Sequence, residues 1–329
     1  MSTRIVITGG SGFLGSLLAR RLLREPVGLG GAQPAPVDEL TLVDLVAPPA
    51  DVLADRRVRP VSGELGTALD DVGDVDAVFH LAGVVSGAAE ADFDLGMHTN
   101  IDGTRTVLEY GRRHAAPPLV IFSSSLAVFG SDPALGPVGD VDDDTLPRPQ
   151  SSYGIQKFIG EQLVADYTRK GFVRGRSVRL VTVSVRPGRP NAAASGFLSG
   201  IIREPLAGRR ARCPVDPDTP VALSSPRRSL DGILRAAAVD DTTWGSRTAM
   251  TLPALTTTPR EMARALDRVA GAAVSDLIDW DDDPVVGNIV GSWPARFHTS
   301  RAHRLGLHAD ASFDDIVREY LTDNPGARS

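Results

Sequence analysis

The feature that most constrains the fold of this chain is a glycine-rich segment near its N-terminus. Residues 4–8 form a short apolar run, as buried strands do. The segment Thr8-Gly-Gly-Ser-Gly-Phe-Leu-Gly15 follows directly, and leucines then recur at helical spacing as far as Arg24. A strand, a tight glycine turn and a helix in this order predict the first unit of an α/β fold that binds a dinucleotide.

Each part of this turn has a physical role in binding a cofactor. Glycines let the backbone turn sharply, approach a pyrophosphate closely and pack the helix against the strand. The first turn of the helix presents free amides and the positive end of its dipole to the phosphates. A glycine triplet alone is weak evidence, but its place between a strand and a helix makes it specific. We predict that five residues here bind the dinucleotide: Gly9, Gly12, Phe13, Leu14 and Gly15.

The next predicted strand, residues 39–44, ends in the carboxylate of Asp44. An acid at this position accepts hydrogen bonds from the adenosine ribose and repels a 2′-phosphate, so it favours NAD over NADP. The alternative is an ordinary aspartate at the end of a strand. A third short strand is expected over residues 58–62, and Glu64 and Leu65 beyond it are expected to lie near the adenine.

Strands and helices continue to alternate through the first half of the chain. Further strands are predicted at 77–81, 119–122 and 179–185, and helices at 92–114 and 152–170. Leu81 and Ala82, at the end of the fourth strand, are expected to pass close to the cofactor. This alternation predicts an α/β fold with a Rossmann-type doubly wound parallel sheet.

The alternating pattern ends after Arg186. A chain of 329 residues is longer than the roughly 250–300 residues that one core usually serves. We therefore expect an NAD-binding domain over 1–186 and a smaller substrate lobe over 187–329, with some later elements returning to the sheet. In the lobe, helices are predicted at 197–206 and, from a capping box at Thr258-Pro-Arg-Glu261, as far as residue 270.

Composition excludes several classes of function. The net charge is −6 and no basic block occurs, so we expect no nucleic-acid partner. The single Cys213 excludes an internal disulfide, and no Cys/His spacing indicates a metal site. No apolar run approaches the length of a membrane span, and the N-terminus lacks a basic leader, so a cytoplasmic location is expected.

The chemistry is predicted from Tyr153 and Lys157, which lie four residues apart in the predicted helix 152–170 and so share one face. A neighbouring ammonium lowers the pKa of a phenol from its ordinary value of about 10 and makes it a base. Taken alone, such a pair is more often a contact on a helix surface. The serines 123–125 end a predicted strand where open α/β sheets place their chemistry, and they supply a partner hydroxyl. The chain has no Gly-x-Ser-x-Gly motif, which argues against a serine hydrolase.

Together these motifs resemble the extended short-chain dehydrogenase/reductase family over nearly the whole chain. The matching segments are the glycine turn 8–15, Asp44, His80-Leu-Ala-Gly83, Asn100-x-x-Gly-Thr104, Ser123-Ser-Ser-x-x-Val-Phe-Gly130, Tyr153-x-x-x-Lys157 and Arg186-Pro187. One departure concerns the adenine end, where the family often has Asp and this chain has Glu64.

The resemblance implies a role for each matched residue. Tyr153 acts as the base and Ser125 binds the reacting oxygen. Lys157 binds the nicotinamide ribose and lowers the pKa of Tyr153. Asn100 holds a water or a backbone carbonyl behind the lysine, and Pro187 contacts the cofactor.

Within the family, segments 83–87, 89–96, 123–130, 187–195 and 224–227 resemble those of members that oxidise short sugar acids. This resemblance implies NAD-dependent oxidation of the C2 hydroxyl of such an acid, by a homodimer formed through helices 92–114 and 152–170. A carboxylate substrate needs a cationic anchor, and the fork of an arginine suits it. The candidate anchors are Arg186, Arg189 and Arg227, and the other expected substrate contacts are Ser86, Ser125, Tyr153 and Asn191.

Rival functions within the resemblance stay open. A nucleotide-sugar epimerase uses the same Ser/Tyr/Lys set, with NAD that remains tightly bound and no net redox change. A dehydratase carries acids just after the catalytic hydroxyl, where this chain has Leu126 and Ala127. A non-catalytic NAD-sensing protein typically lacks the Tyr/Lys pair that this chain retains.

Overall fold

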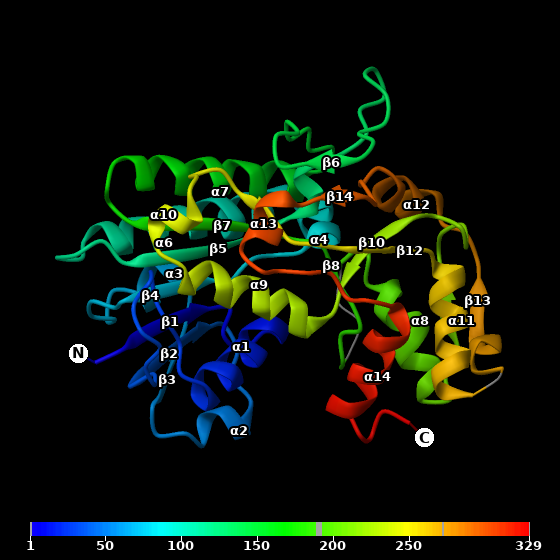
Figure 1. Ribbon diagram of the computed structural model, residues 1–329, viewed down its shortest axis with the longest axis horizontal. Coiled ribbons are helices and arrows are strands. Elements are labelled where there is room, and N and C mark those ends of the chain that lie inside the picture. The colour runs from blue at the N-terminus through cyan, green and yellow to red at the C-terminus, as the bar shows by residue number, and fades with distance from the viewer. Residues whose placement is uncertain (1, 189–192, 272, 329) are drawn as a thin grey trace.

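A seven-stranded parallel sheet organises the computed structural model, which describes residues 2–188, 193–271 and 273–328 (Figure 1). The strand order is β11-β7-β5-β4-β1-β2-β3, and all neighbours are parallel. The strands are β1 (Arg4–Thr8), β2 (Glu39–Asp44), β3 (Val58–Ser62), β4 (Ala77–His80), β5 (Leu119–Ser125), β7 (Arg174–Leu180) and β11 (Met250–Thr251). The order reverses beside β1, which is the topological switch point where such sheets bind ligands. The predicted fold class is confirmed.

Helices cover both faces of this sheet, as Figure 1 shows. One face carries α1 (Phe13–Arg24) and α9 (Pro226–Ala238), and the other carries α6 (Gly103–Arg112) and α7 (Ser152–Arg169). In β1, Ile5 and Ile7 are buried on the first face and Val6 on the second. A strand that is buried on both faces has a continuous apolar sequence, which is why residues 4–8 were recognisable as a strand.

The sixth strand of the sheet lies earlier in the chain than predicted. The sequence indicated residues 179–185, but β7 spans Arg174–Leu180, and β8 (Thr182–Val183) belongs to a separate sheet. The strand was missed because it contains Arg176, which is fully buried. Its guanidinium donates to the Val239 carbonyl at 2.7 Å and to an Asp241 carboxylate oxygen at 2.7 Å, so the charge is satisfied inside the protein.

The lobe packs a second hydrophobic core against α8 (Phe197–Leu206), α11 (Pro259–Ala270) and α14 (Phe313–Asp323). The predicted helices 197–206 and 258–270 are confirmed. Thr258 accepts a hydrogen bond from the Glu261 amide at 3.2 Å and so caps α11. Elements α9 and β11 return from the C-terminal half to the main sheet. The proposed domain boundary at residue 186 stays a prediction.

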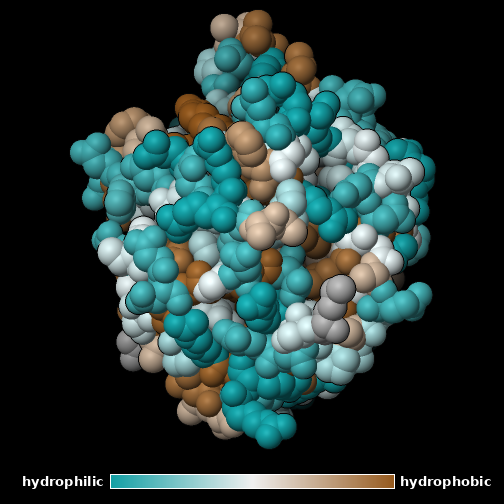
Figure 2. Space-filling model, turned by 90° about the vertical axis from the view of Figure 1, so that its left-hand side faces the viewer, coloured by the Kyte–Doolittle hydropathy of each residue, from teal (hydrophilic) through white to brown (hydrophobic). Residues whose placement is uncertain are grey.

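Shorter elements complete the described chain. They are α2 (Ala50–Leu53), α3 (Leu65–Ala68), α4 (Ser86–Ala91), α5 (Phe93–Gly96), η1 (Met97–Asp102), η2 (Leu126–Val128), β6 (Val141–Asp142), β9 (Ala211–Cys213), β10 (Val221–Ser224), α10 (Asp241–Trp244), β12 (Leu255–Thr257), η3 (Val274–Leu277), β13 (Ile278–Trp280), α12 (Pro284–Gly291), β14 (Phe297–His298) and α13 (Ser300–Arg304). Among the described residues, no helix has the length and apolar character needed to span a bilayer. The end of the molecule shown in Figure 2 is mostly hydrophilic, with apolar side chains in small separate spots.

Candidate active site

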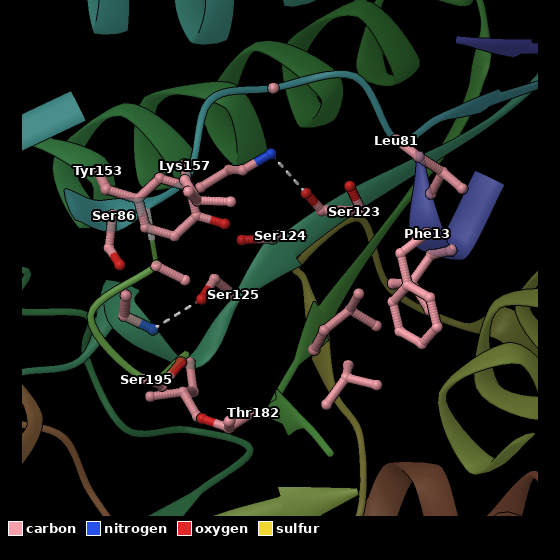
Figure 3. A pocket seen from close by; sticks show the side chains of 18 of the residues that line it. Phe13, Leu81, Ser86, Ser123, Ser124, Ser125, Tyr153, Lys157, Thr182 and Ser195 are labelled. Atoms are coloured by element: carbon pink, nitrogen blue, oxygen red, sulfur yellow. Dashed lines mark hydrogen bonds between the residues drawn. The ribbon is translucent and has the colours of Figure 1, made fainter. Parts of the chain in front are cut away.

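A cleft at the carboxyl ends of the sheet strands, facing the lobe, gathers most of the predicted site residues (Figure 3). It lies where doubly wound sheets bind their ligands. Predicted residues that line it are Gly9, Gly12, Phe13, Leu14, Gly15, Leu81, Ser86, Ser125, Tyr153, Lys157 and Arg186. The roles assigned to these residues stay predictions, and the geometry described below bears on each of them.

The glycine turn fits a dinucleotide. A side chain at Gly15 would place its Cβ 2.1 Å from the Gly9 carbonyl oxygen, so no larger residue allows α1 to begin this close to the turn. At Gly9, φ is +70° and a Cβ would lie 2.7 Å from the Ala82 amide nitrogen. Gly12 precedes α1 without a side-chain cap, and the first turn carries no acid. The free amides there suit a pyrophosphate.

Asp44 lies at the end of β2, beside the glycine turn. Its carboxylate accepts hydrogen bonds from the Ser11 amide at 2.9 Å and from the Leu45 amide at 2.7 Å. The side chain is half-buried and therefore keeps one side accessible. A carboxylate held in this way at the switch point is in place to accept bonds from ribose hydroxyls, which favours NAD.

Ser125 and Tyr153 meet in the cleft from different elements, the end of β5 and the first turn of α7. Burial raises the pKa of Tyr153 above its ordinary value, while a hydrogen bond with Ser125 and the charge of Arg186 act in the opposite direction. The sequence predicted a lowered pKa and credited Lys157. That direction is wrong, because desolvation outweighs the favourable contacts, and among the described residues the cation that acts on the phenol is Arg186.

Lys157 is buried behind the tyrosine. Its ammonium donates to the Ser123 carbonyl at 2.9 Å, and it lies 5.8 Å from the centre of the Tyr153 ring (Figure 3). Burial lowers the pKa of Lys157 to about 8, and the nearby Glu161 carboxylate opposes this shift. The lysine is thus held at the edge of the cleft, and its expected contact with the nicotinamide ribose stays a prediction.

Asn100 does not line the cleft but supports its wall. It lies in the π-helical segment η1 inside the predicted helix 92–114, which the structure divides into α5, η1 and α6. Its amide group accepts from the Val84 amide at 3.0 Å and donates to the Val84 carbonyl at 3.2 Å and to Gln156 at 2.7 Å. Asn100 therefore binds backbone rather than a side chain of the cleft wall, since both the amide and the carbonyl of Val84 are bonded to it.

A buried chain of hydrogen bonds connects this asparagine to the glycine turn. Thr104 donates its only hydroxyl proton to the Asn100 carbonyl at 2.6 Å, so it accepts from Nε2 of His80, 3.1 Å away. Nδ1 of His80 then accepts from the Thr8 hydroxyl at 2.7 Å. Burial and the charge of Lys157 lower the pKa of His80 to about 3, so the ring stays neutral. The imidazole connects β1, β4 and α6 without carrying charge.

A buried ion pair lies behind the serines. Glu161, one helical turn after Lys157, accepts two hydrogen bonds from Arg179 of β7, at 2.8 and 2.7 Å, and one from the Ser124 hydroxyl at 2.5 Å. Both charged side chains are almost completely inaccessible to water. Ser124 lies between Ser123, which binds the lysine, and Ser125. The pair therefore sets how the end of β5 lies against α7.

Arg186 is the predicted anchor that the structure brings to the reacting groups. It follows β8 and lines the cleft, and its charge acts on Tyr153. Its own carbonyl accepts from Arg203 at 2.8 Å and its amide donates to Ser199 at 3.0 Å, so α8 holds its backbone. Among the described residues its guanidinium has no hydrogen bond or ion pair, which leaves the fork available for an anionic ligand.

The structure describes one of the two other arginines predicted as carboxylate anchors. Arg227 is exposed and forms an ion pair with Glu319 at 2.8 Å, in a neighbouring cavity between α1, α9 and α14 that also contains Pro187. Arg227 does not line the cleft, because the first turn of α9 directs it to α14, and its contact with the substrate stays a prediction without support from this geometry. Arg189 and Asn191 lie outside the described residues.

The residues predicted at the adenine end also lie outside the lining of the cleft. Glu64 is the N-cap residue of α3 without a side-chain cap, is largely exposed and lies 3.7 Å from the His98 imidazole. Leu65 begins α3, and Ala82 contacts the glycine turn through its backbone. The adenine role of Glu64 and Leu65 stays a prediction.

Sequence reasoning missed part of the site. Thr182 and Trp293 line the cleft, but no motif marks them; Ser195 also lines it and ends the matched segment 187–195, where no role was predicted for it. They come from segments far apart in the chain that only the folded lobe brings together. The pair Glu161 and Arg179 did carry a signal, since Glu161 follows Lys157 at helical spacing and so lies on the same face of α7.

The fold and the site together define a dinucleotide-dependent enzyme of the oxidoreductase type, with a serine, tyrosine and lysine at its centre. The sequence model of the NAD dependent epimerase/dehydratase family matches residues 5–222. The chain belongs to this family, and its cofactor is NAD.

Named relatives cover almost the whole chain. A D-erythronate dehydrogenase of Cupriavidus necator is 52% identical over 97% of this chain and 98% of its own. A D-erythronate dehydrogenase of Haemophilus influenzae is 40% identical over the same shares. A solved structure of a nucleoside-diphosphate-sugar epimerase from Agrobacterium tumefaciens is 37% identical, covers 99% of this chain and 95% of its own, and superposes with a TM-score of 0.87.

Proposed function

We propose that this enzyme oxidises the C2 hydroxyl of D-erythronate to the 2-oxo acid, with NAD as the oxidant. The observation that carries the proposal is the position of Arg186, which lies in the same cleft as Ser125 and Tyr153 and acts on the phenol. A 2-hydroxy acid has its carboxylate on the carbon next to the one that reacts. An anchor beside the base is therefore what such a substrate requires. The two dehydrogenases named above support this choice of acid.

Ser125 and Tyr153 act on the same substrate oxygen. Ser125 donates a hydrogen bond to the C2 oxygen as it becomes a carbonyl oxygen, and Tyr153 in its phenolate form removes the hydroxyl proton. When bound, NAD supplies the acceptor for the hydride from C2. The ammonium of Lys157, fixed to the Ser123 carbonyl, holds the ribose side of the cofactor and adds positive charge behind the base.

Arg186 has two effects in this proposal. Its fork binds the carboxylate and so orients C2 toward the cofactor. Its charge also favours the phenolate of Tyr153 over the phenol. The phenol therefore becomes a base only when burial is offset by this charge, by Ser125 and by the charges of the cofactor complex.

A second candidate is an epimerase that acts on a nucleotide sugar, because the solved Agrobacterium structure carries that name. The two functions differ in their use of NAD. An epimerase recycles a tightly bound cofactor, whereas a dehydrogenase releases NADH at each turnover. Protein that keeps one NAD per chain through dialysis and forms no NADH favours the epimerase.

The test is NADH formation, followed by absorbance, with purified protein, NAD and a panel of three- to six-carbon sugar acids that includes D-erythronate. We expect turnover on D-erythronate, and a loss of ~10³-fold or more in Tyr153→Phe because the general base is removed. Phenylalanine keeps the ring, so NAD binding measured by calorimetry serves as the control. Absence of NADH with every acid would refute the proposal.

We also propose that the enzyme is a cytoplasmic homodimer. Four apolar side chains are exposed on neighbouring elements α5 and α7, and they are Phe93, Leu95, Ile155 and Ile159. An exposed apolar group of this kind favours contact with a partner surface. The mass measured by light scattering tests the proposal, and Ile155→Lys with Ile159→Lys is expected to give monomers.

A further inference from the structure

One polar side chain of the cleft has no role in the chemistry described above. Ser195 precedes α8 and retains only 8% of its accessible surface. Its hydroxyl lines the cleft and makes no hydrogen bond within the described part of the chain. The hydroxyl oxygen is accessible from the cleft, so it can bind a polar group that enters there. Ser195 therefore indicates a position where a polar group of a ligand binds.

The segment that carries Ser195 is held in place. The amide of Ala194 donates to the hydroxyl of Ser86 at 3.1 Å, which fixes this turn to the start of α4. On its other side, the Ser195 carbonyl accepts from the Leu198 amide at 3.1 Å. The hydroxyl is thus presented by a backbone anchored at both ends, which is the condition for selective binding.

The position of Ser195 favours the substrate over the cofactor. In Figure 3 it lies on the opposite side of Ser125 from Phe13 and Leu81, which belong to the cofactor side of the cleft. Ser125 and Tyr153 account for the C2 oxygen, and Arg186 accounts for the carboxylate. The hydroxyls on the carbons beyond C2 still need partners once they leave water.

We propose that Ser195 binds a hydroxyl of the acid beyond C2 and so selects polyhydroxylated acids over their deoxy counterparts, an inference that rests on the proposed function. A site that hydrogen-bonds a substrate hydroxyl discriminates strongly against an analogue that lacks it, because its own polar group is then left unpaired. The ligand class is a short, polyhydroxylated 2-hydroxy acid.

The experiment measures kcat/KM for wild type and Ser195→Ala with three acids of matched configuration. These are D-erythronate, 2,4-dihydroxybutanoate, which lacks the C3 hydroxyl, and 2,3-dihydroxybutanoate, which lacks the C4 hydroxyl. We expect Ser195→Ala to lower kcat/KM on D-erythronate by ~3–10-fold. We expect no loss on the one deoxy acid that already lacks the partner hydroxyl.

Two further variants separate binding from folding. Ser195→Cys keeps the shape of the side chain with a slightly larger, weakly donating group, and it should reproduce the alanine result if the hydrogen bond matters. Ser229→Ala is the control, since Ser229 is also a buried serine, bonds to the Ser225 carbonyl at 3.0 Å and lies outside the lining of the cleft. It should leave the ratios between the three acids unchanged.

The outcomes are distinct. An equal loss on all three acids, no loss on any acid, or a loss that appears as a raised KM for NAD overturns the role of Ser195 and leaves the proposed function intact. Failure of the wild-type enzyme to oxidise any of the acids overturns the proposed function, and the inference with it.

Discussion

The two sides of the cleft differ in how their polar side chains are satisfied. On the side formed by β5 and α7, Lys157 and Glu161 have protein partners within hydrogen-bond distance, and Asn100 of η1 binds Gln156 of α7 behind them. On the side formed by the lobe, the Arg186 and Ser195 side chains make no hydrogen bond within the described residues. The first side is arranged by folding alone, whereas we propose that a ligand completes the second. Catalysis needs polar groups that the protein already holds in place, whereas selection of a substrate uses polar groups that only the substrate can pair.

The largest effect is expected on the first side, at Glu161. Glu161→Gln leaves Arg179 buried without its countercharge, which should lower the free energy of unfolding by about 3–5 kcal/mol. It also removes the charge that raises the pKa of Lys157, so loss of activity at high pH should begin at a lower pH. Urea unfolding and a pH profile of kcat measure the two effects.

A double variant sharpens this prediction. Glu161→Leu with Arg179→Met removes both charges, so much of the stability should return. Activity should stay low, because Ser124 has lost the acceptor that aligns it between Ser123 and Ser125. Full recovery of kcat in the double variant would contradict a role for the pair in positioning these serines.

The next effect is expected on the second side, at Arg186. Arg186→Gln should lower kcat/KM for D-erythronate by ~10–100-fold, because a charge-assisted bond to the carboxylate is lost. The pKa of Tyr153 should rise further without this cation, so the activity should require a higher pH. Stability should change little, since the guanidinium has no hydrogen bond or ion pair among the described residues. Arg227→Gln is the matched control and should leave kcat/KM unchanged.

The smallest effect concerns His80, which folding keeps neutral. Its pKa is about 3 in the folded protein and about 6.5 when unfolded. The contribution of the neutral imidazole to the free energy of unfolding is fully present above pH 6.5 and is lost as the pH falls toward 3. Between pH 7 and pH 5 the loss is about 2 kcal/mol. His80→Asn should remove this pH dependence in chemical unfolding, and an unchanged slope would contradict the neutral imidazole.

These variants together test whether the two sides of the cleft differ as described. Changes on the β5 and α7 side should alter stability and kcat together, because its contacts exist before the substrate arrives. Changes on the lobe side should alter kcat/KM and leave stability nearly intact. The opposite result, with Arg186→Gln unfolding the protein and Glu161→Gln affecting only the binding of substrate, would reverse the assignment of the two sides.

The sequence by itself determined the parts of this protein that depend on local spacing. The glycine turn is recognisable because strand, turn and helix are adjacent in the chain. Tyr153 and Lys157 share a face of α7 because helical geometry places residues four apart together. The parallel sheet follows from the alternation of strands and helices, and the Thr258 cap follows from a short capping motif.

Tertiary structure alone decided the parts that depend on distant contacts. Arg186 and Arg227 are equivalent candidates in the sequence, and only the path of the chain sends one to Tyr153 and the other to Glu319. Strand β7 was misplaced because its buried arginine is satisfied by residues more than 60 positions away. Ser195 and Trp293 reach the cleft only after the lobe has packed. The partners of a buried charge and the residues that line a cavity come from distant parts of the chain, so a local sequence pattern does not show which of them will meet.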